Sequence, residues 1–160
     1  LNTNMQDISV MGFFKRITGY HNLANFYFVI PAGILMLLPL YRFSKWGNSR
    51  FQLTYLAQLL IGLVIFSTSA ESPTYVIAVV GFGIWYVLHA PKPAFYLYLL
   101  LVLVLVLTVF SPTDLFPEVF QAIVVKFALK ALPCFLAWLF ISYNLLFNSF
   151  DNNSLPHEKA

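Results

Sequence analysis

Three groups of polar side chains interrupt an otherwise apolar chain, and each contains residue types that could take part in a reaction. The first group is a hydroxyl-rich turn at 67–75, in which Glu71 is followed by Ser72 and Thr74. A carboxylate accepts hydrogen bonds strongly, so Glu71 could hold a sugar hydroxyl or act as a general base. The alternative is structural: Ser72 or Glu71 caps the next helix, with Pro73 in its first turn.

The second group is a turn that contains Pro112, Asp114 and Pro117. An aspartate in such a rigid turn commonly hydrogen-bonds to nearby backbone N–H groups, which favours a structural role. Binding of a substrate by Asp114 is the second interpretation of the same pattern.

The third group is basic. Lys126 and Lys130 are four residues apart and therefore share one face of a helix. Two ammonium groups at this spacing could bind a phosphate, for instance the phosphate of a lipid-linked donor. They could equally extend to the phosphates of bulk lipid as anchors. Arg16, near the N-terminus, raises the same two alternatives.

Several other kinds of site find no support in the residues. The histidines His21, His89 and His157 have no metal-ligand spacing, and Cys134 is the single cysteine. There is no glycine loop that could bind a phosphate. The net charge of +3 comes from cations scattered between apolar runs, which does not indicate a nucleic-acid partner. We therefore expect neither a metal nor a cofactor.

The elements that must position these groups are strongly apolar. Hydrophobic residues make up 60% of the 160 residues and charged residues 9%, against about 25% charged in soluble domains. A bilayer core about 30 Å thick requires about 20 helical residues to cross it. The sequence thus predicts an all-α polytopic membrane bundle of about five transmembrane helices. The five runs are Leu23 to Tyr41, Phe51 to Thr68, Tyr75 to His89, Ala94 to Phe110 and roughly Val125 to Phe147.

A short helix is predicted before the first run. Val10, Phe13 and Phe14 fall on one face and Lys15 and Arg16 on the other, after a polar start at 1–9. Ser9 is the expected N-cap. Such a basic amphipathic helix typically lies flat at a membrane interface; the alternative is a simple lead-in to the first run.

The cations between the runs predict how the bundle is oriented. One side collects Arg42, Lys45, Arg50, Lys92 and Lys159, and the positive-inside rule makes that side cytoplasmic. The predicted location is the plasma membrane, with a multi-pass chain and a cytoplasmic C-terminus. The candidate site residues then share the periplasmic face. Residues 1–147 form the predicted single transmembrane domain, and 148–160 a polar tail predicted to be disordered.

Four stretches together resemble one enzyme family. They are Asp7 to Ile17, Ser69 to Tyr75, Ser111 to Pro117 and Ala128 to Cys134. The chain resembles the C-terminal part of a bacterial glycosyltransferase family 87 protein, in the form found among Bacteroidetes. The resemblance covers nearly the whole chain, and we expect the chain to be a piece of a longer protein.

The resemblance implies a membrane enzyme of the GT-C type. Such enzymes transfer a mannose-like hexose from a polyprenyl-phosphate donor to a lipid or glycan acceptor at the outer face of the plasma membrane. Their catalytic base is typically an aspartate in an early outer loop, so the resemblance assigns no catalytic residue to this fragment. The resemblance supports Glu71 as a site residue and is consistent with a donor-phosphate role for Lys126, Lys130 and Arg16. The full set of candidates for donor or substrate binding is Glu71, Ser72, Thr74, Lys126, Lys130, Arg16 and Asp114.

A different class of function fits the same composition. A non-catalytic membrane scaffold, or a subunit of a transporter or flippase, would also consist of apolar helices in contact with membrane lipids. An ion-coupled transporter needs ionisable groups near the middle of its helices. Here the main polar exception is Gln58, which argues against ion coupling and leaves a scaffold open.

Overall fold

The computed structural model describes residues 9–19, 24–67, 72–89, 95–110, 124, 128–148 and 150. Regular structure within these ranges is entirely helical, which confirms the all-α prediction. The α-helices are α1 (Val10–Thr18), α2 (Phe26–Leu37), α3 (Ser49–Ile65), α4 (Tyr75–His89), α5 (Phe95–Leu103) and α7 (Ala131–Phe147). The shorter segments are the 3₁₀ turns η2 (Leu38–Tyr41), η3 (Phe43–Lys45) and η4 (Ser72–Thr74), and the π-helix η5 (Val104–Phe110).

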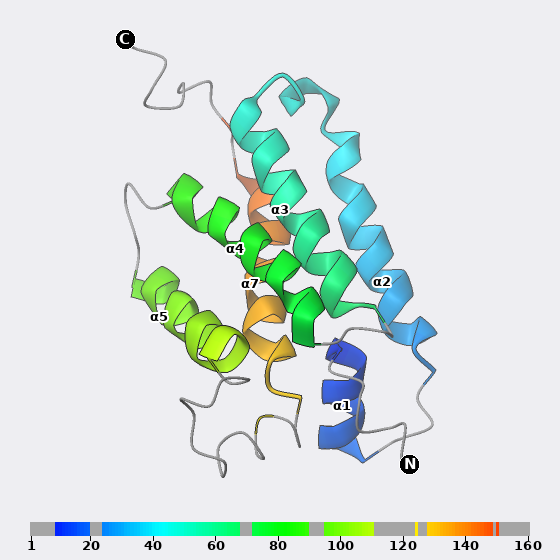
Figure 1. The fold of residues 1–160 in the computed structure, drawn as a ribbon. Coiled ribbons are helices and arrows are strands. Elements are labelled where there is room, and N and C mark those ends of the chain that lie inside the picture. The colour runs from blue at the N-terminus through cyan, green and yellow to red at the C-terminus, as the bar shows by residue number, and fades with distance from the viewer. Residues whose placement is uncertain are drawn as a thin grey trace.

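Helix α3 stands at the centre of the bundle (Figure 1). It packs most extensively against α4 and α7 and more narrowly against α2. Helix α5 lies beside α4 and α7 on the side away from α2 (Figure 1). The short α1 lies against α7 at the end of the bundle where α7 begins.

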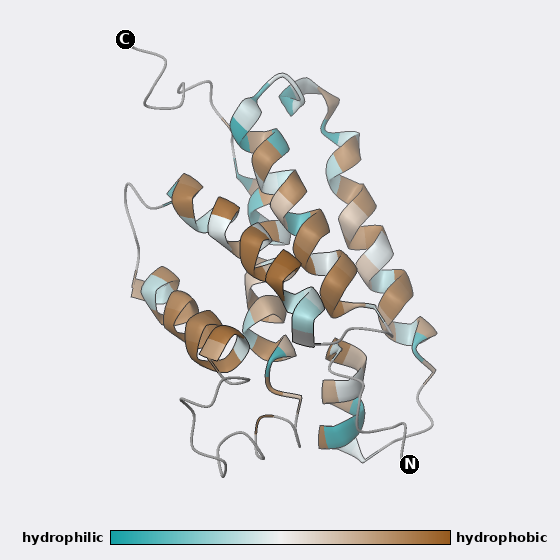
Figure 2. Ribbon diagram, viewed as in Figure 1, coloured by the Kyte–Doolittle hydropathy of each residue, from teal (hydrophilic) through white to brown (hydrophobic). Residues whose placement is uncertain are grey.

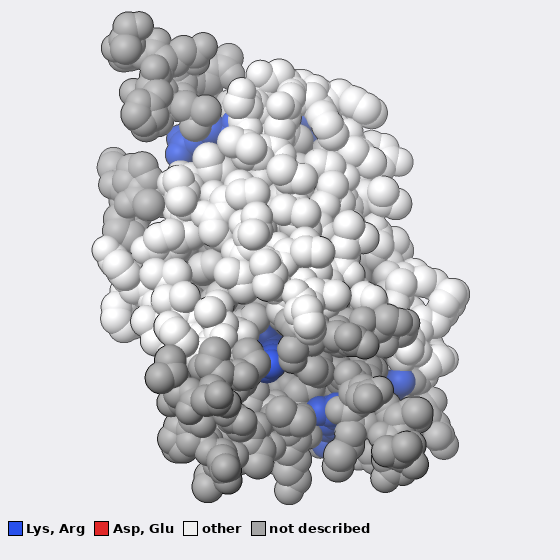
Figure 3. Space-filling view, in the orientation of Figure 1, with Lys and Arg blue, Asp and Glu red and all other residues white. Residues whose placement is uncertain are grey.

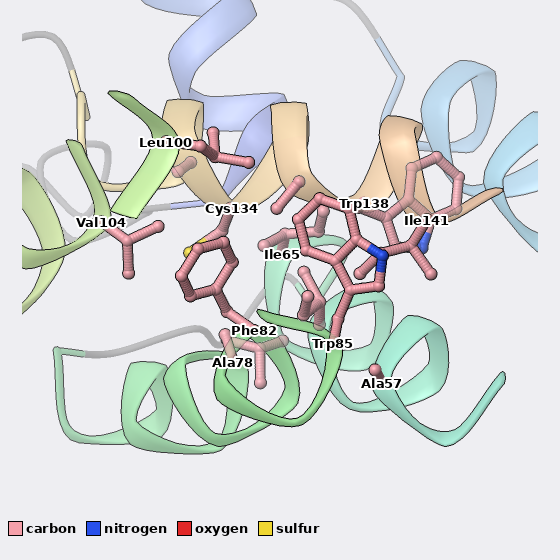
Figure 4. Close-up of a cluster of buried hydrophobic side chains, with 14 of the residues drawn as sticks. Ala57, Ile65, Ala78, Phe82, Trp85, Leu100, Val104, Cys134, Trp138 and Ile141 are labelled. Carbon is pink, nitrogen blue, oxygen red and sulfur yellow. The ribbon is translucent and has the colours of Figure 1, made fainter. Parts of the chain in front are cut away.

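The core lies between α3, α4 and α7 (Figure 4). Trp85 from α4 and Trp138 from α7 are at most 1% exposed, and Ile61 of α3 is fully buried. Gly81 allows α4 to approach α3 closely, because a Cβ there would lie 3.0 Å from the Ala57 carbonyl oxygen. Large indole rings and close backbone contact together fill the interior.

A proline sets the end of α2. Pro39 has no N–H, so the carbonyl of Leu35 lacks its usual partner four residues on, and the chain tightens into η2. Gln58 of α3 supplies the missing donor: its Nε2 lies 3.2 Å from the Leu35 carbonyl oxygen and 2.9 Å from Oγ of Ser142 in α7. Gln58, the main polar residue in the middle of the second apolar run, thus joins three helices.

The prediction of five transmembrane helices is wrong. Across the described ranges, no helix combines the length and apolar character that crossing a membrane requires. The longest, α3 and α7, have 17 residues each, which at about 1.5 Å per residue gives about 26 Å against a hydrocarbon core of about 30 Å. Two of the apolar runs do not form a single continuous α-helix. The first run changes at Leu38 into a 3₁₀ turn, and the fourth run changes at Val104 into a π-helix.

The predicted multi-pass location in the plasma membrane is corrected by the same finding. Its assignment of sides, with a periplasmic active face and a cytoplasmic C-terminus, therefore loses its basis. The predicted tail at 148–160 lies outside the described residues except for Asn148 and Phe150.

The predicted N-terminal helix is present as α1. The Gly12 backbone N–H donates to Oγ of Ser9 at 3.2 Å, which confirms the predicted N-cap. Its apolar residues Val10, Met11 and Phe13 are at most 9% exposed and pack against the rest of the chain. The apolar face of α1 therefore belongs to the protein interior and is not open to a headgroup layer.

Candidate functional site

Three of the predicted site residues, Glu71, Asp114 and Lys126, lie outside the described residues. Whether Lys126 and Lys130 share a helical face is therefore not tested. Ser72 begins η4, and Thr74 ends it with an exposed side chain directly before α4. The structure therefore makes η4 a 3₁₀ turn that leads into α4, at the place where the sequence predicted a helix start.

The remaining predicted residues lie at one end of the bundle. We call this the α1 end: it holds α1, the last residues of α3 and the first turns of α4 and α7 (Figure 1). The ring of Phe135 in α7 lies 6.1 Å from that of Phe14 in α1 and 6.3 Å from that of Phe66 after α3. Arg16, Thr74 and Lys130 are all at this end.

The turn before α7 has an unusual backbone. Ala128 is fully buried and has a φ of 51°, in the left-handed region that residues with a Cβ avoid. Thr108, in the π-helix η5, donates its hydroxyl to the Lys130 carbonyl oxygen at 3.2 Å. Left-handed non-glycine residues and π-helical turns both occur often at functional sites. Here the two features meet at Lys130.

Lys130 itself is only 4% exposed. Burial lowers the pKa of its ammonium group, because the charged form loses its hydration. The side chain does not extend outwards as a lipid anchor would, so that interpretation of Lys130 is wrong. A cation in such surroundings attracts an anion more strongly than one in water, because the local dielectric constant is lower.

Two further cations of the α1 end belong to α1. Nζ of Lys15 donates to Oδ1 of Asn25, the residue that precedes α2. Arg16 is half-buried in the last turn of the helix.

The cations at the other end of the bundle stabilise helix C-termini. We call this the capped end. Arg42 donates to the carbonyl oxygens of Leu145 at 2.6 Å and Asn148 at 3.0 Å, at the end of α7. Arg50 donates to the Leu88 carbonyl oxygen at 2.7 Å, at the end of α4. The last carbonyls of a helix lack partners within it, and a cation there also complements the helix dipole.

Sequence reasoning missed this role of Arg42 and Arg50. It treated them only as loop charges that set an orientation. Arg42 lies 103 residues before Leu145, and no local pattern indicates such a partner. The available signal was weak: both arginines directly flank predicted helix ends.

Comparison with known proteins gives no further assignment. No family model, curated protein or solved structure matches this chain. The resemblance to glycosyltransferase family 87 therefore stays a prediction. In the described ranges, no group of three or more His, Cys, Asp and Glu side chains is placed to hold a metal ion.

Proposed function

We propose that this chain is the donor-binding part of a glycosyltransferase that takes a hexose from a polyprenyl-phosphate donor. The observation that carries the proposal is that Lys15, Arg16 and Lys130 all lie at the α1 end. A polyprenyl-phosphate sugar has an anionic phosphate joined to a long apolar chain. The α1 end offers cations next to exposed apolar side chains such as Ile17 and Phe26.

The chemistry that these cations supply is stabilisation of the leaving group. When the sugar departs, negative charge builds up on the donor phosphate, and a fixed cation nearby lowers the energy of that state. The half-buried guanidinium of Arg16 is suited to a two-point contact with phosphate oxygens. Activation of the acceptor hydroxyl needs a general base, which the family resemblance places outside this fragment. The acceptor is a lipid or a glycan.

The test is a sugar-transfer assay with the intact gene product, a polyprenyl-phosphate mannose labelled in the sugar, and a polyprenol or glycan acceptor. Arg16→Ala and Lys130→Ala are each expected to lower kcat/KM for the donor by about 10- to 100-fold. This corresponds to the loss of one charged contact worth about 1.5–3 kcal/mol. Lys45→Ala, at the capped end, is the matched control and should leave donor kinetics unchanged.

Unchanged donor kinetics in the Arg16→Ala/Lys130→Ala double variant would reject the donor-binding role. The alternative function is a non-catalytic scaffold, and the exposed apolar side chains on several helices favour it as an interaction surface. Absence of any transfer by the intact gene product would support that alternative.

A further inference from the structure

Helix α2 consists of apolar residues, with brown positions along its length in Figure 2, but the chain covers only one of its sides. It contains no charged residue, and its only polar side-chain group is the hydroxyl of Tyr27. Ala32 is its one buried residue, and Leu35 and Met36 are partly buried against the core. A helix that is apolar all round is normally covered all round. The side of α2 opposite Ala32 therefore needs a partner, which the described residues do not provide.

This uncovered side of α2 has the residue spacing of a helix–helix seam. Four residues separated by four, three and four positions form one row along the helix: Phe26, Ile30, Gly33 and Leu37. We call this row the α2 seam. Its three large side chains are exposed, by 66% for Phe26, 40% for Ile30 and 59% for Leu37. Helices with this spacing pack by inserting side chains of one helix into gaps of the other.

The α2 seam is complementary to a second copy of itself that runs in the opposite direction. The two-fold axis of such a pair passes between positions 31 and 32, and each residue contacts the same partner residue in both copies. Ile30 then faces the partner's Gly33, and Phe26 faces the partner's Leu37. Gly33 provides the gap that Ile30 requires, because a Cβ there meets nothing within 4 Å in its own chain. One helix thus supplies both the protruding and the recessed part of the contact.

The surface around the α2 seam is large enough for a stable dimer. Aromatic side chains border both ends of the seam: Phe26 and Tyr27 begin α2, and Tyr41 and Phe43 follow it. They are 66% to 82% exposed, and a buried aromatic side chain removes about 150–250 Å² from water, so the four offer roughly 400–800 Å². A standard interface covers about 800 Å² per partner. In an antiparallel pair, the aromatic residues at the start of one α2 meet those after the end of the other.

Charge does not oppose this pairing. Figure 3 shows Lys and Arg atoms towards both ends of the molecule and none on the face between them. Antiparallel helices also place opposite ends of their dipoles side by side, which is favourable. We propose that the α2 seam is the interface of an antiparallel, two-fold symmetric dimer of this chain. The inference is independent of the donor-binding role, since it uses no cation of the α1 end.

Sedimentation equilibrium of the full chain tests the association. The unchanged chain should form dimers at concentrations up to about 100 μM. Gly33→Leu fills the recess for the partner's Ile30 and should raise the dissociation constant by about 30-fold or more, because each dimer contains two such recesses. Gly83→Leu is the matched control in α4, where a Cβ also meets nothing within 4 Å, and should leave dimerisation unchanged. A chain that stays monomeric, or equal effects of the two variants, would overturn the proposal.

Disulfide cross-linking in cells that express the full chain tests the antiparallel arrangement. Phe26→Cys and Leu37→Cys, expressed together, should cross-link to each other under a mild oxidant. Leu37→Cys alone should not, because its two copies lie about 16 Å apart along the helix axes and a disulfide needs Cα atoms within about 7 Å. The native Cys134 gives little background, since it is fully buried and burial raises the pKa of its thiol to about 12.

Two cross-linking results would contradict the arrangement. Efficient cross-linking of Leu37→Cys with itself would overturn it in favour of a parallel pair. Absence of a cross-link between Phe26→Cys and Leu37→Cys, in a chain that sediments as a dimer, would show that the two copies associate through another surface.

Discussion

Two energetically unfavourable features lie next to each other before α7. The ammonium group of Lys130 is buried, and Ala128, two residues earlier, has a left-handed backbone conformation. Neither arrangement is needed to begin a helix, since Ser, Asp or Asn before the first turn does so without strain. Strain that persists in a folded protein is compensated by the surrounding structure and commonly marks a site with a role. The buried lysine is therefore the residue at which the donor-binding proposal is most directly tested.

The burial of Lys130 predicts a pH dependence of stability. An unfolded lysine has a pKa near ~10.4, and burial lowers the pKa in the folded protein. Between the two pKa values the unfolded chain binds more protons, so the free energy of unfolding rises with pH there and is lowest below the folded pKa. Lys130→Met removes this penalty and should stabilise the protein at neutral pH, by a margin that shrinks towards pH ~10.

Chemical denaturation at a series of pH values measures this margin. Lys45→Met, at the capped end, corrects for the loss of one positive charge. A Lys130→Met margin that is independent of pH after this correction would contradict the prediction.

Gly62 is a second residue at which the structure predicts the effect of a substitution on stability. A Cβ on Gly62 would lie 2.8 Å from Nε1 of Trp138 and 2.8 Å from Cε of Met36, where three helices meet. Gly62→Ala should lower the free energy of unfolding by about 1–3 kcal/mol, because overpacking outweighs the gain in helix propensity. Gly83→Ala is the matched control in α4, where a Cβ meets nothing within 4 Å. It should raise stability by about 0.5–1 kcal/mol, and equal effects of the two in denaturation curves would contradict the packing argument.

At the scale of elements, the apolar runs predicted where helices form but not how long each one is. The third run, Tyr75 to His89, coincides with α4, while the first run divides into α2 and η2. Pro39 was visible in the sequence, yet its effect depends on the Leu35 carbonyl finding Gln58 across the bundle. Likewise, the sequence identified the cationic residues of the candidate site. It did not predict that Lys130 is buried, because this burial depends on the packing of η5 and of the turn at 128–130.

A double-mutant cycle with Pro39 tests whether the Gln58 side chain compensates for the backbone N–H that Pro39 lacks. Gln58→Leu leaves the Leu35 carbonyl without a donor and should cost about 1–3 kcal/mol in denaturation experiments. Pro39→Ala restores a backbone N–H that can bond to this carbonyl, so the cost of Gln58→Leu should fall in the Pro39→Ala background. Additive effects in this double-mutant cycle would show that the amide does not compensate for the proline.

At the scale of the whole molecule, the capped end connects the segment between α2 and α3 to the end of α7. Arg42→Ala should destabilise the protein by about 1.5–3 kcal/mol, because it removes two hydrogen bonds from a charged donor. The loss should be local, seen as faster amide hydrogen exchange in the last turn of α7 with little change in α4. Arg42→Lys keeps the charge but not the forked donor, and should give an intermediate effect. Unchanged exchange in α7 after Arg42→Ala would contradict this role.

The contact from Arg42 to Leu145 also has a consequence for biosynthesis. The two residues are 103 positions apart, and ribosomes add about 5–20 residues per second. For roughly 5 to 20 seconds of translation, the guanidinium group therefore exists in a nascent chain before its carbonyl partner has been made. The bond at the end of α7 can therefore form only after α7 has been made, and a nascent chain truncated before α7 leaves Arg42 without the Leu145 carbonyl.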